Sequence, residues 1–554
     1  MKKLNPSPRR LYFLLTVMLF AGVLPAQQEQ FLNSNNVNAG IAIGGNLFSD
    51  SILVVGNTTN EKFELPKGSG KNLIFTQALW MSALDVNNSL HVAASRYFDY
   101  GRDYFDGPVA NVYDSIYDRY YRRVFKVTQA EIAHFKTLAF PVNAAQVDSA
   151  ILFWPAKGNP SVMGDYGVNI SSPLAPFVDL NGNGIYEPLL GDYPGICGDE
   201  GIFFVYNDIR AAHTQTGGTP LGVEIRGMAS AFTDSTSNIP YDKRAINNSV
   251  FVRYEIENKS QNAYNSFNVG NWMDPDIGCF MNDFAGCDSA RNLLFAYNGT
   301  TTDPDCAPEN GYGSLQVALG VKLLNQPLSV FGCFSGQGAP SPAVSDPITA
   351  YQYNLLLNGF WSDTTAFEYG GTGFNSGGGV TKYMFTGDLN NATQWSEVSD
   401  NDVPGDRRMY GATNTSTFSV GEIKHFDYVF YGSYDSTSNH IGIVDTLKRD
   451  ADILQNFYQN TIVPCQVQFT TAINNIEPQL AVSIYPNPAH NLVTISTSDY
   501  MKSVELMDIQ GRLLSTQIVG AKTTTLPVSN LAKGVYLVNI QCVGGSVVRR
   551  IVVE

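Results

Sequence analysis

The sequence predicts a mostly β, multidomain protein. We expect a multidomain β-sandwich region of immunoglobulin-like type with long loops and few helices, followed by a second, small β-sandwich at the C-terminus. The chain has 554 residues, which corresponds to three or four domains at about 150 residues each. Hydrophobic residues make up 44 % of it and charged residues 15 %, so it can bury sizeable cores. Its 50 Gly, 27 Pro and 29 Tyr are typical of short strands joined by many turns.

Residues 1–26 are a predicted signal peptide. Four basic residues precede an uncharged apolar run, Leu11–Leu24. A run of about 14 residues is too short to cross a bilayer, which takes about 20, but it suits a secretory signal. Its removal takes four positive charges away and changes the net charge from −15 to about −19, a balance that repels nucleic acid and anionic lipid. No later run is long and apolar enough for a transmembrane helix, so we expect a secreted chain with no nucleic-acid partner.

Residues 27–245 are predicted to form short strands, long loops and one helix. Thr128 and Glu131 have the spacing of a capping box, in which each side chain bonds the other residue's backbone N–H. Apolar residues at helical spacing follow, and Pro141 ends the element.

Residues 246–465 are predicted to form an immunoglobulin-like sandwich with long insertions. From Val250 to Ile256 apolar residues occupy alternate positions, which is typical of a half-buried strand. A second such strand is Lys424–Tyr431, and an apolar stripe from Val444 to Phe457 predicts a closing helix. Residues 466–480 are interpreted as a linker.

The last segment, residues 481–554, contains six strand candidates separated by turn signals such as Pro486-Asn487-Pro488. Its motifs are Ser483–Pro488, Val504–Arg512, Leu531–Val538 and the ending Arg549–Val553. In these motifs it resembles the type A C-terminal sorting domain of type IX secretion system substrates from Bacteroidota-type bacteria. The resemblance implies that this domain docks on the outer-membrane translocon and is removed by a surface sortase. The remaining cargo would then be released outside the cell or joined to anionic lipopolysaccharide on the extracellular side of the outer membrane.

The cargo also contains segments that are similar to parts of many large exported proteins of these bacteria. They are Leu79–Asp85, Phe177–Pro188 with Gly191–Pro194, Asp274–Gly278 and Gly405–Arg408. This second resemblance implies an exported surface protein and specifies no reaction.

The best candidate site is a calcium loop that begins at Asp179. Oxygen-bearing side chains at positions 1, 3 and 5, Gly at position 6, a backbone carbonyl at 7 and an acid at 9 match the start of such a loop. Position 12 is Leu190, so Asp192 would supply the last ligand. The predicted ligands are Asp179, Asn181, Asn183, Ile185 (through its backbone carbonyl), Glu187 and Asp192. The alternative is a series of Asx turns without metal.

A second acidic cluster comprises Asp274, Asp276, Asp283 and Asp288. It would bind another cation or form a solvated loop braced by a disulfide, for which Cys279 and Cys287 are the first candidates. A glycosidase pair of carboxylates is a third interpretation. Cys542 lies in an apolar strand and is expected to be a buried thiol.

Two further segments have both a functional and a packing interpretation. Seven tyrosines between Tyr97 and Tyr121 alternate with arginines, and they would stack on sugars or, as we expect, pack the loops. Gly405–Arg408 would bind an anion or, as we expect, form a turn held by an internal ion pair.

The sequence lacks the short motifs of several enzyme classes. It contains no H-x-x-x-H pair, no G-x-S-x-G elbow, no P-loop and no dinucleotide fingerprint. We therefore expect a secreted or cell-surface protein with a structural or adhesive role and calcium-braced loops. The alternative is an extracellular carbohydrate-active enzyme or a glycan-binding protein.

Overall fold

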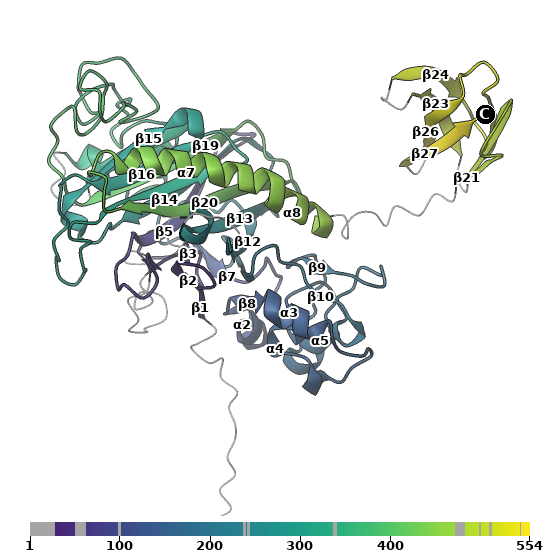
Figure 1. The fold of residues 1–554 in the computed structure, drawn as a ribbon, viewed down its shortest axis with the longest axis horizontal. Helices are drawn as coiled ribbons and strands as arrows, with labels where there is room; N and C mark the ends of the chain where they lie inside the picture. Colours follow the sequence, from purple (N-terminus) through teal and green to yellow (C-terminus); the bar gives the residue numbers. More distant parts are fainter. Residues whose placement is uncertain are drawn as a thin grey trace, which may run out of the picture. The chain divides into compact units, whose positions relative to one another are not determined.

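The computed structural model describes residues 28–49, 62–97, 101–235, 240, 244–335, 341–470, 482–497, 500–508, 512–542 and 545–554 (Figure 1). The chain divides into two compact units, residues 1–469 and 470–554. The predicted signal peptide lies outside the described residues.

In its described part, the first unit is built on two nine-stranded antiparallel sheets. The first sheet has the order β1 (Glu29–Leu32), β2 (Asn38–Ala42), β3 (Asn46–Leu47), β5 (Ile74–Asp85), β14 (Tyr264–Pro275), β19 (Arg407–Thr415) and β18 (Val330–Ser335), with β4 (Phe63–Glu64) on β2 and β6 (Leu90–Ala94) on β5. The second sheet has the order β15 (Asp283–Asp288), β16 (Leu293–Asn298), β17 (Gln316–Leu323), β20 (Ile423–Asp435), β13 (Ser249–Asn258), β12 (Val223–Ala231), β11 (Glu200–Asn207) and β7 (Phe105–Asp106), with β8 (Phe125–Thr128) on β11.

The two sheets pack face to face around one core. On β13 the predicted alternation is confirmed, because Val252 and Tyr254 are buried in this core while Glu255 is partly exposed. Tyr254 Oη donates to Gln77 Oε1 of the opposite sheet at 3.3 Å. The ring of Phe48, just after β3, packs edge-on against Phe430 of β20 with centroids 5.0 Å apart. Side chains from both sheets therefore fill one space between them.

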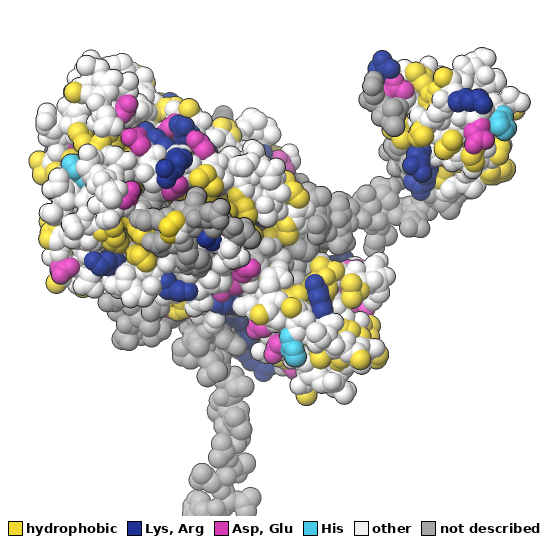
Figure 2. Space-filling view, viewed as in Figure 1, with side chains coloured by type: hydrophobic (Ala, Val, Ile, Leu, Met, Phe, Trp, Pro, Cys, Tyr) yellow, Lys and Arg dark blue, Asp and Glu magenta, His cyan; other side chains and the backbone are white. Residues whose placement is uncertain are grey.

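Helices cover the outer faces of the sandwich. On the first sheet, Trp80 stacks on Trp272 at 5.5 Å and meets Tyr353 of α6 (Ala350–Leu357) edge-on at 4.8 Å. On the second sheet lies α7 (Ile443–Phe457), which covers the strands in Figure 1 and buries the predicted apolar stripe, including Leu447. Its other face carries intermingled charges (Figure 2), among them Asp452, which pairs with Arg291 at 3.0 Å.

Residues 107–199 form a helical segment with its own core beside the edge of the second sheet. The described helices here are α2 (Ser115–Tyr121), α3 (Gln129–Phe135), α4 (Ser149–Leu152) and α5 (Pro160–Tyr166). The predicted capping box of α3 is confirmed: Thr128 Oγ1 accepts from Glu131 N at 3.2 Å, and Glu131 Oε2 accepts from Thr128 N at 2.7 Å. The other three helices were not predicted, because four to seven residues are too few to show a helical repeat.

The predicted boundary between residues 245 and 246 does not divide the structure. β12 pairs with β13 over nine residue pairs, from Val223–Asn258 to Ala231–Val250, and β5 pairs with β14. Strands on both sides of the boundary thus share both sheets. Alternation along one strand shows which face is buried but not which strand is its neighbour, and so the sequence pattern suggested two domains. The sandwich also contains more strands than the seven to nine of an immunoglobulin domain.

The second unit is a small sandwich, as predicted. One sheet has the order β21 (Val482–Tyr485), β22 (Leu492–Thr497) and β25 (Thr523–Pro527); the other has the order β24 (Leu513–Ile518), β23 (Met501–Met507), β26 (Gly534–Cys542) and β27 (Gly545–Val553). Both contribute to one core that includes Ile495 and Ile540. The predicted linker begins inside a helix, because α7 continues through a π-helical turn (Tyr458–Ile462) into α8 (Val463–Thr470). Residues 471–480 of that linker lie outside the described residues.

The disulfides differ from the prediction. Cys279 bonds Cys306, and Cys197 bonds Cys465. The expected Cys279–Cys287 pair is wrong, because the Cys287 side chain points from β15 into the sandwich core and donates to Met384 O at 3.4 Å. Cys542 is buried on β26, as expected.

Candidate functional site

The predicted calcium loop connects β9 (Phe177–Val178) to β10 (Tyr193–Pro194), which pair as a short antiparallel ladder. Gly182 and Gly184 have φ values of 72° and 75°, in the left-handed region that favours glycine. Asp179 accepts from the backbone N–H groups of both, through Oδ1 at 2.7 Å and Oδ2 at 2.6 Å. The glycines therefore let the backbone fold around the first carboxylate.

The next side chains continue this pattern. Asn181 Oδ1 accepts from Asn183 N at 3.0 Å, and Asn183 Oδ1 accepts from Ile185 N at 2.8 Å. The Nδ2 groups of both asparagines donate to the same atom, Glu187 Oε2, at 3.1 and 2.6 Å. Positions 3, 5 and 9 of the loop thus converge on one point.

Asp192 is buried at the end of the loop and accepts two hydrogen bonds from the loop backbone. Its Oδ1 accepts from Leu180 N at 2.9 Å and its Oδ2 from Glu187 N at 2.8 Å. Burial raises the pKa of Asp192, and the nearby carboxylates of Asp179 and Glu187 raise it further. The structure therefore brings the predicted side chains of this loop together and makes it rich in negative charge.

The chemistry of this donor set fits a hard cation such as calcium, since it offers three carboxylates and two amides. The amide nitrogens of Asn181 and Asn183 face Glu187 in this structure, so a cation would require both side chains to turn their oxygens toward it. The same hydrogen bonds also form a set of Asx turns, which is the alternative that the sequence left open.

The second predicted acidic cluster has a different membership in the structure. Asp274 and Asp276, at the end of β14, meet Asp406, which precedes β19, and their carboxylate oxygens lie within 4.8 Å of one another. This is the only such trio among the described residues. Asp283 remains close enough to Asp276 for each carboxylate to disfavour the other's charge. Asp288 pairs instead with Arg291 at 2.9 Å.

Arg408 and Tyr97 hold this cluster. Arg408 Nη1 lies 2.7 Å from Asp274 Oδ1 and also contacts Asp406, while Tyr97 Oη donates to Asp274 Oδ2 at 2.8 Å. Burial raises the pKa of Asp274 to about 7 and raises that of Asp276 well above its ordinary range. The internal ion pair expected in Gly405–Arg408 is present between Asp406 and Arg408, but the segment is not the predicted turn, because Arg407 already begins β19. Arg407 pairs with Glu397 at 2.7 Å, so neither arginine is left for an anion.

A cavity of about 440 Å³ lies beside this cluster and includes Asp406 in its wall. Trp361, Phe334 and Met384 contribute apolar surface. Burial raises the pKa of Glu397, also in the wall, to about 7. Its Oε1 accepts from Arg407, and its Oε2 accepts from the backbone N–H of Ala285. Both oxygens of Glu397 are thus engaged by other parts of the chain.

The tyrosine-rich stretch packs internally, as expected. Tyr104, Tyr117, Tyr120 and Tyr121 are buried, Tyr97 and Tyr113 are partly buried, and Tyr100 lies outside the described residues. The guanidinium groups of Arg119 and Arg123 lie over the ring of Tyr166 at 5.0 and 4.9 Å. Each of the five tryptophans is at most 2 % exposed: Trp80, Trp154, Trp272, Trp361 and Trp395. These rings therefore stabilise the core, and Trp361 also borders the cavity beside Asp406.

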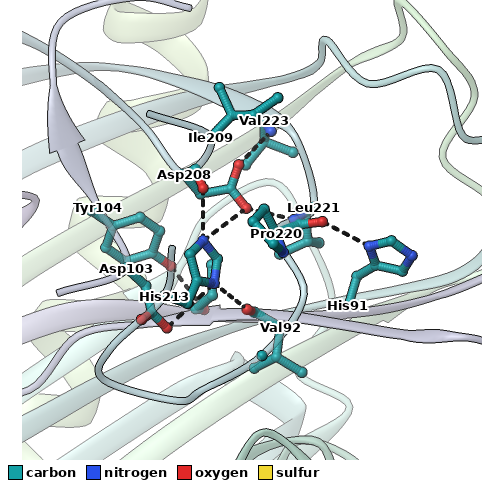
Figure 3. A network of polar contacts seen from close by, with 12 residues as sticks. His91, Val92, Asp103, Tyr104, Asp208, Ile209, His213, Pro220, Leu221 and Val223 are labelled. Carbon is teal, nitrogen blue, oxygen red and sulfur yellow. Dashed lines mark hydrogen bonds and ion pairs between the residues drawn. The ribbon is translucent and has the colours of Figure 1, made fainter. Parts of the chain in front are cut away.

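The sequence did not reveal a buried histidine network (Figure 3). His213 Nδ1 lies 2.8 Å from Val92 O and Nε2 lies 2.6 Å from Asp208 O. Each ring nitrogen therefore faces a backbone carbonyl oxygen. The carboxylates of Asp103 and Asp208 flank the ring at 3.6 and 3.7 Å, and all three side chains are fully buried. Through these contacts His213 fixes the loop after β11 to β6.

Residues 483–554 match the family described as the secretion system C-terminal sorting domain. The C-terminal unit is a type IX sorting domain. This confirms the resemblance in Ser483–Pro488 and the later motifs, and it identifies the chain as a substrate of the type IX secretion system that is exported to the cell surface or beyond. No described helix is long and apolar enough to cross a membrane.

No curated protein matches the sequence. Similar solved structures include a polysaccharide lyase, with 8 % identity, coverage of 60 % of this chain and 34 % of that chain, and a TM-score of 0.18. A putative kojibiose phosphorylase from the human microbiome has 6 % identity, coverage of 52 % of this chain and 24 % of that chain, and a TM-score of 0.24. A third is PorZ, a surface component of the type IX secretion system of Porphyromonas gingivalis, with 12 % identity, coverage of 66 % of this chain and 50 % of that chain, and a TM-score of 0.12. The chain thus spans half or less of each of these proteins, and TM-scores in this range do not indicate a shared fold.

Proposed function

We propose that the exported cargo, residues 28–470, has a structural or adhesive role outside the cell, and that calcium braces its 179–192 loop. The observation that supports this most directly is the burial of every tryptophan together with the engagement of both Glu397 oxygens. Sugar-processing sites usually present aromatic faces beside free carboxylates. The rigid, aromatic-filled sandwich supports a scaffold better than a catalyst.

Calcium would order a loop that has little core of its own. Asn181, Asn183 and Ile185 are exposed, and Asp179 and Glu187 are only partly buried. Their mutual repulsion with Asp192 is a cost that a bound cation removes. In that state Asp179, Asn181, Asn183, Glu187, Asp192 and the carbonyl of Ile185 would hold the ion.

Thermal melting of the full chain in calcium and in chelator tests the bracing. We expect a higher midpoint in calcium, and we expect Glu187→Gln, which removes the charge on which both asparagines converge, to lose most of that difference. Glu368→Gln, in another loop, is the matched control and should keep it. Equal midpoints with and without calcium in the unmutated protein would contradict the bracing.

The adhesive role is tested on cells. Bacteria that produce the protein should attach to surfaces or to one another more than a deletion strain, and chelation should reduce attachment. The sorting domain predicts contacts with the translocon and the surface sortase, so removal of residues 481–554 should trap the cargo in the periplasm. Attachment to anionic lipopolysaccharide would show as a modified, membrane-associated form after the sorting domain is cut off.

A second candidate function is glycan binding or carbohydrate processing, which the cavity beside Glu397 and Asp406 favours. Its volume of about 440 Å³ and its partly aromatic wall suit a small sugar. A glycan array and a polysaccharide hydrolysis screen with the full chain separate the two proposals. If the unmutated protein turns over a glycan and Glu397→Gln abolishes that turnover, the carbohydrate-processing role replaces the structural role.

A further inference from the structure

We infer that Asp274, Asp276 and Asp406 form a buried site for a hard divalent cation, calcium or magnesium, separate from the 179–192 loop. The three carboxylates offer oxygen atoms within 4.8 Å of one another. Each of these residues is at most 7 % exposed. Clustered carboxylate oxygens without His or Cys suit calcium or magnesium rather than zinc.

The site stands on rigid elements. Asp274 is in β14 and Asp406 directly precedes β19, and these neighbouring strands pair up to Met273 and Met409. Tyr97 Oη donates to Asp274 Oδ2, which orients that carboxylate. Two paired strands and a buried phenol therefore fix two of the three ligands before any ion arrives.

Two buried carboxylates in this place have oxygen atoms without a partner. The backbone N–H of Asp276 donates to Leu73 O at 3.1 Å, whereas its carboxylate, in a residue that is 5 % exposed, makes no hydrogen bond or ion pair with any residue that the structure describes. Asp283 is fully buried; its Oδ2 accepts from Ile277 N at 3.2 Å, whereas its Oδ1 has no hydrogen-bond partner in the described chain. Buried carboxylate oxygens are rarely left without a partner, so their position beside one another indicates a missing cation.

The cations present do not balance this charge. Arg408 bridges Asp274 and Asp406. Lys62 is the positive group that acts most strongly on Asp276, and its Nζ already pairs with Glu309 at 2.8 Å. The carboxyl group of Asp276 therefore has no direct cationic partner among the described residues.

One of the three ligands borders a cavity, which offers an ion a route toward the site. Asp406 lines the cavity of about 440 Å³, whose wall also includes the 81 % exposed Val403. A metal site needs such a route as well as its ligands. The cavity thus has a role in this proposal that does not depend on a sugar.

The test is calorimetric titration of the chelator-treated full chain with Ca²⁺ and, separately, Mg²⁺, combined with thermal melting. Asp276→Asn keeps the size of the side chain and removes the unpartnered charge. We expect it to remove one bound ion per chain and the corresponding rise in melting midpoint. In chelator, Asp276→Asn should be at least as stable as the unmutated protein, because it removes repulsion; an aspartate with a purely structural role would show the opposite.

Two variants separate this site from the rest of the chain. Asp288→Asn, the acid that pairs with Arg291 outside the cluster, should leave the bound ion in place. Glu187→Gln addresses only the 179–192 loop, so the double variant with Asp276→Asn shows whether the two sites bind independently. The inference is overturned if Asp276→Asn binds as many Ca²⁺ and Mg²⁺ ions as the unmutated protein does. It is also overturned if the carboxylates hold protons instead, so that only lower pH, and no cation, stabilises the cluster.

Discussion

Cys197 and Cys465 form a disulfide that joins the segment before β11 to helix α8, across 268 residues of sequence. The second disulfide, Cys279–Cys306, spans only 27 residues. A cross-link stabilises a fold mainly by restricting the unfolded chain, and the restriction grows with the length of the closed loop.

We predict that the double variant Cys197→Ser/Cys465→Ser loses about 2–5 kcal/mol of unfolding free energy. It should lose more than Cys279→Ser/Cys306→Ser does, by about 2 kcal/mol on the loop-length relation. Chemical denaturation of both variants under oxidising conditions measures the difference. A larger loss from the short-loop pair would show that local packing, rather than chain entropy, determines the effect.

His213→Gln tests the buried histidine network. The substitution removes the ring whose nitrogens lie against Val92 O and Asp208 O and leaves buried polar atoms without a partner, so we predict a loss of about 1–3 kcal/mol of unfolding free energy. His134→Gln, at an exposed position of α3, is the matched control and should change stability by less than about 0.5 kcal/mol. Denaturant unfolding of both variants gives the comparison; equal losses would remove the special role of His213.

The sequence predicted elements that carry a local signal and missed contacts between distant residues. The capping box at Thr128, the alternation in β13 and the stripe on α7 each depend on neighbours within about four residues, and all three are confirmed. His213 has its partners at residues 92, 103 and 208, and no spacing rule relates these positions. Asp406 likewise joins Asp274 only because β19 pairs with β14. The 179–192 loop is the exception among the sites, since all of its polar side chains lie within 14 consecutive residues.

Stability should depend on pH through Glu397. Burial raises its pKa from an ordinary 4.5 to about 7, so the folded state holds this proton more tightly than the unfolded state does. The contribution of this group is therefore fully present below pH of about 4.5 and is lost as the pH rises to about 7, at no more than about 1.4 kcal/mol per pH unit. Glu397→Gln should show a flatter profile over that range.

Unfolding free energies at several pH values between 4.5 and 8 check this, each taken as the difference between variant and unmutated protein. Asp400→Asn changes an exposed acid three residues away, so its unfolding free energy should vary with pH in parallel with that of the unmutated protein. A profile of Glu397→Gln that also runs parallel would show that Glu397 stays ionised across the range.

We predict that one added methyl group has opposite effects on stability at Gly320 and at Gly164. Gly320 on β17 faces Tyr431 on β20, and a Cβ at Gly320 would lie 2.4 Å from two atoms of that ring. Tyr431 cannot easily move, because its hydroxyl donates to Leu447 O of α7 at 2.9 Å. Gly320→Ala should therefore cost about 1–3 kcal/mol, as overpacking of a close-packed core does. Gly164 lies in α5 with nothing within 4 Å of an added Cβ, so Gly164→Ala should stabilise by about 0.5–1 kcal/mol. Denaturant midpoints of the two variants decide the matter, and a neutral Gly320→Ala would mean that α7 can shift away from the sheet.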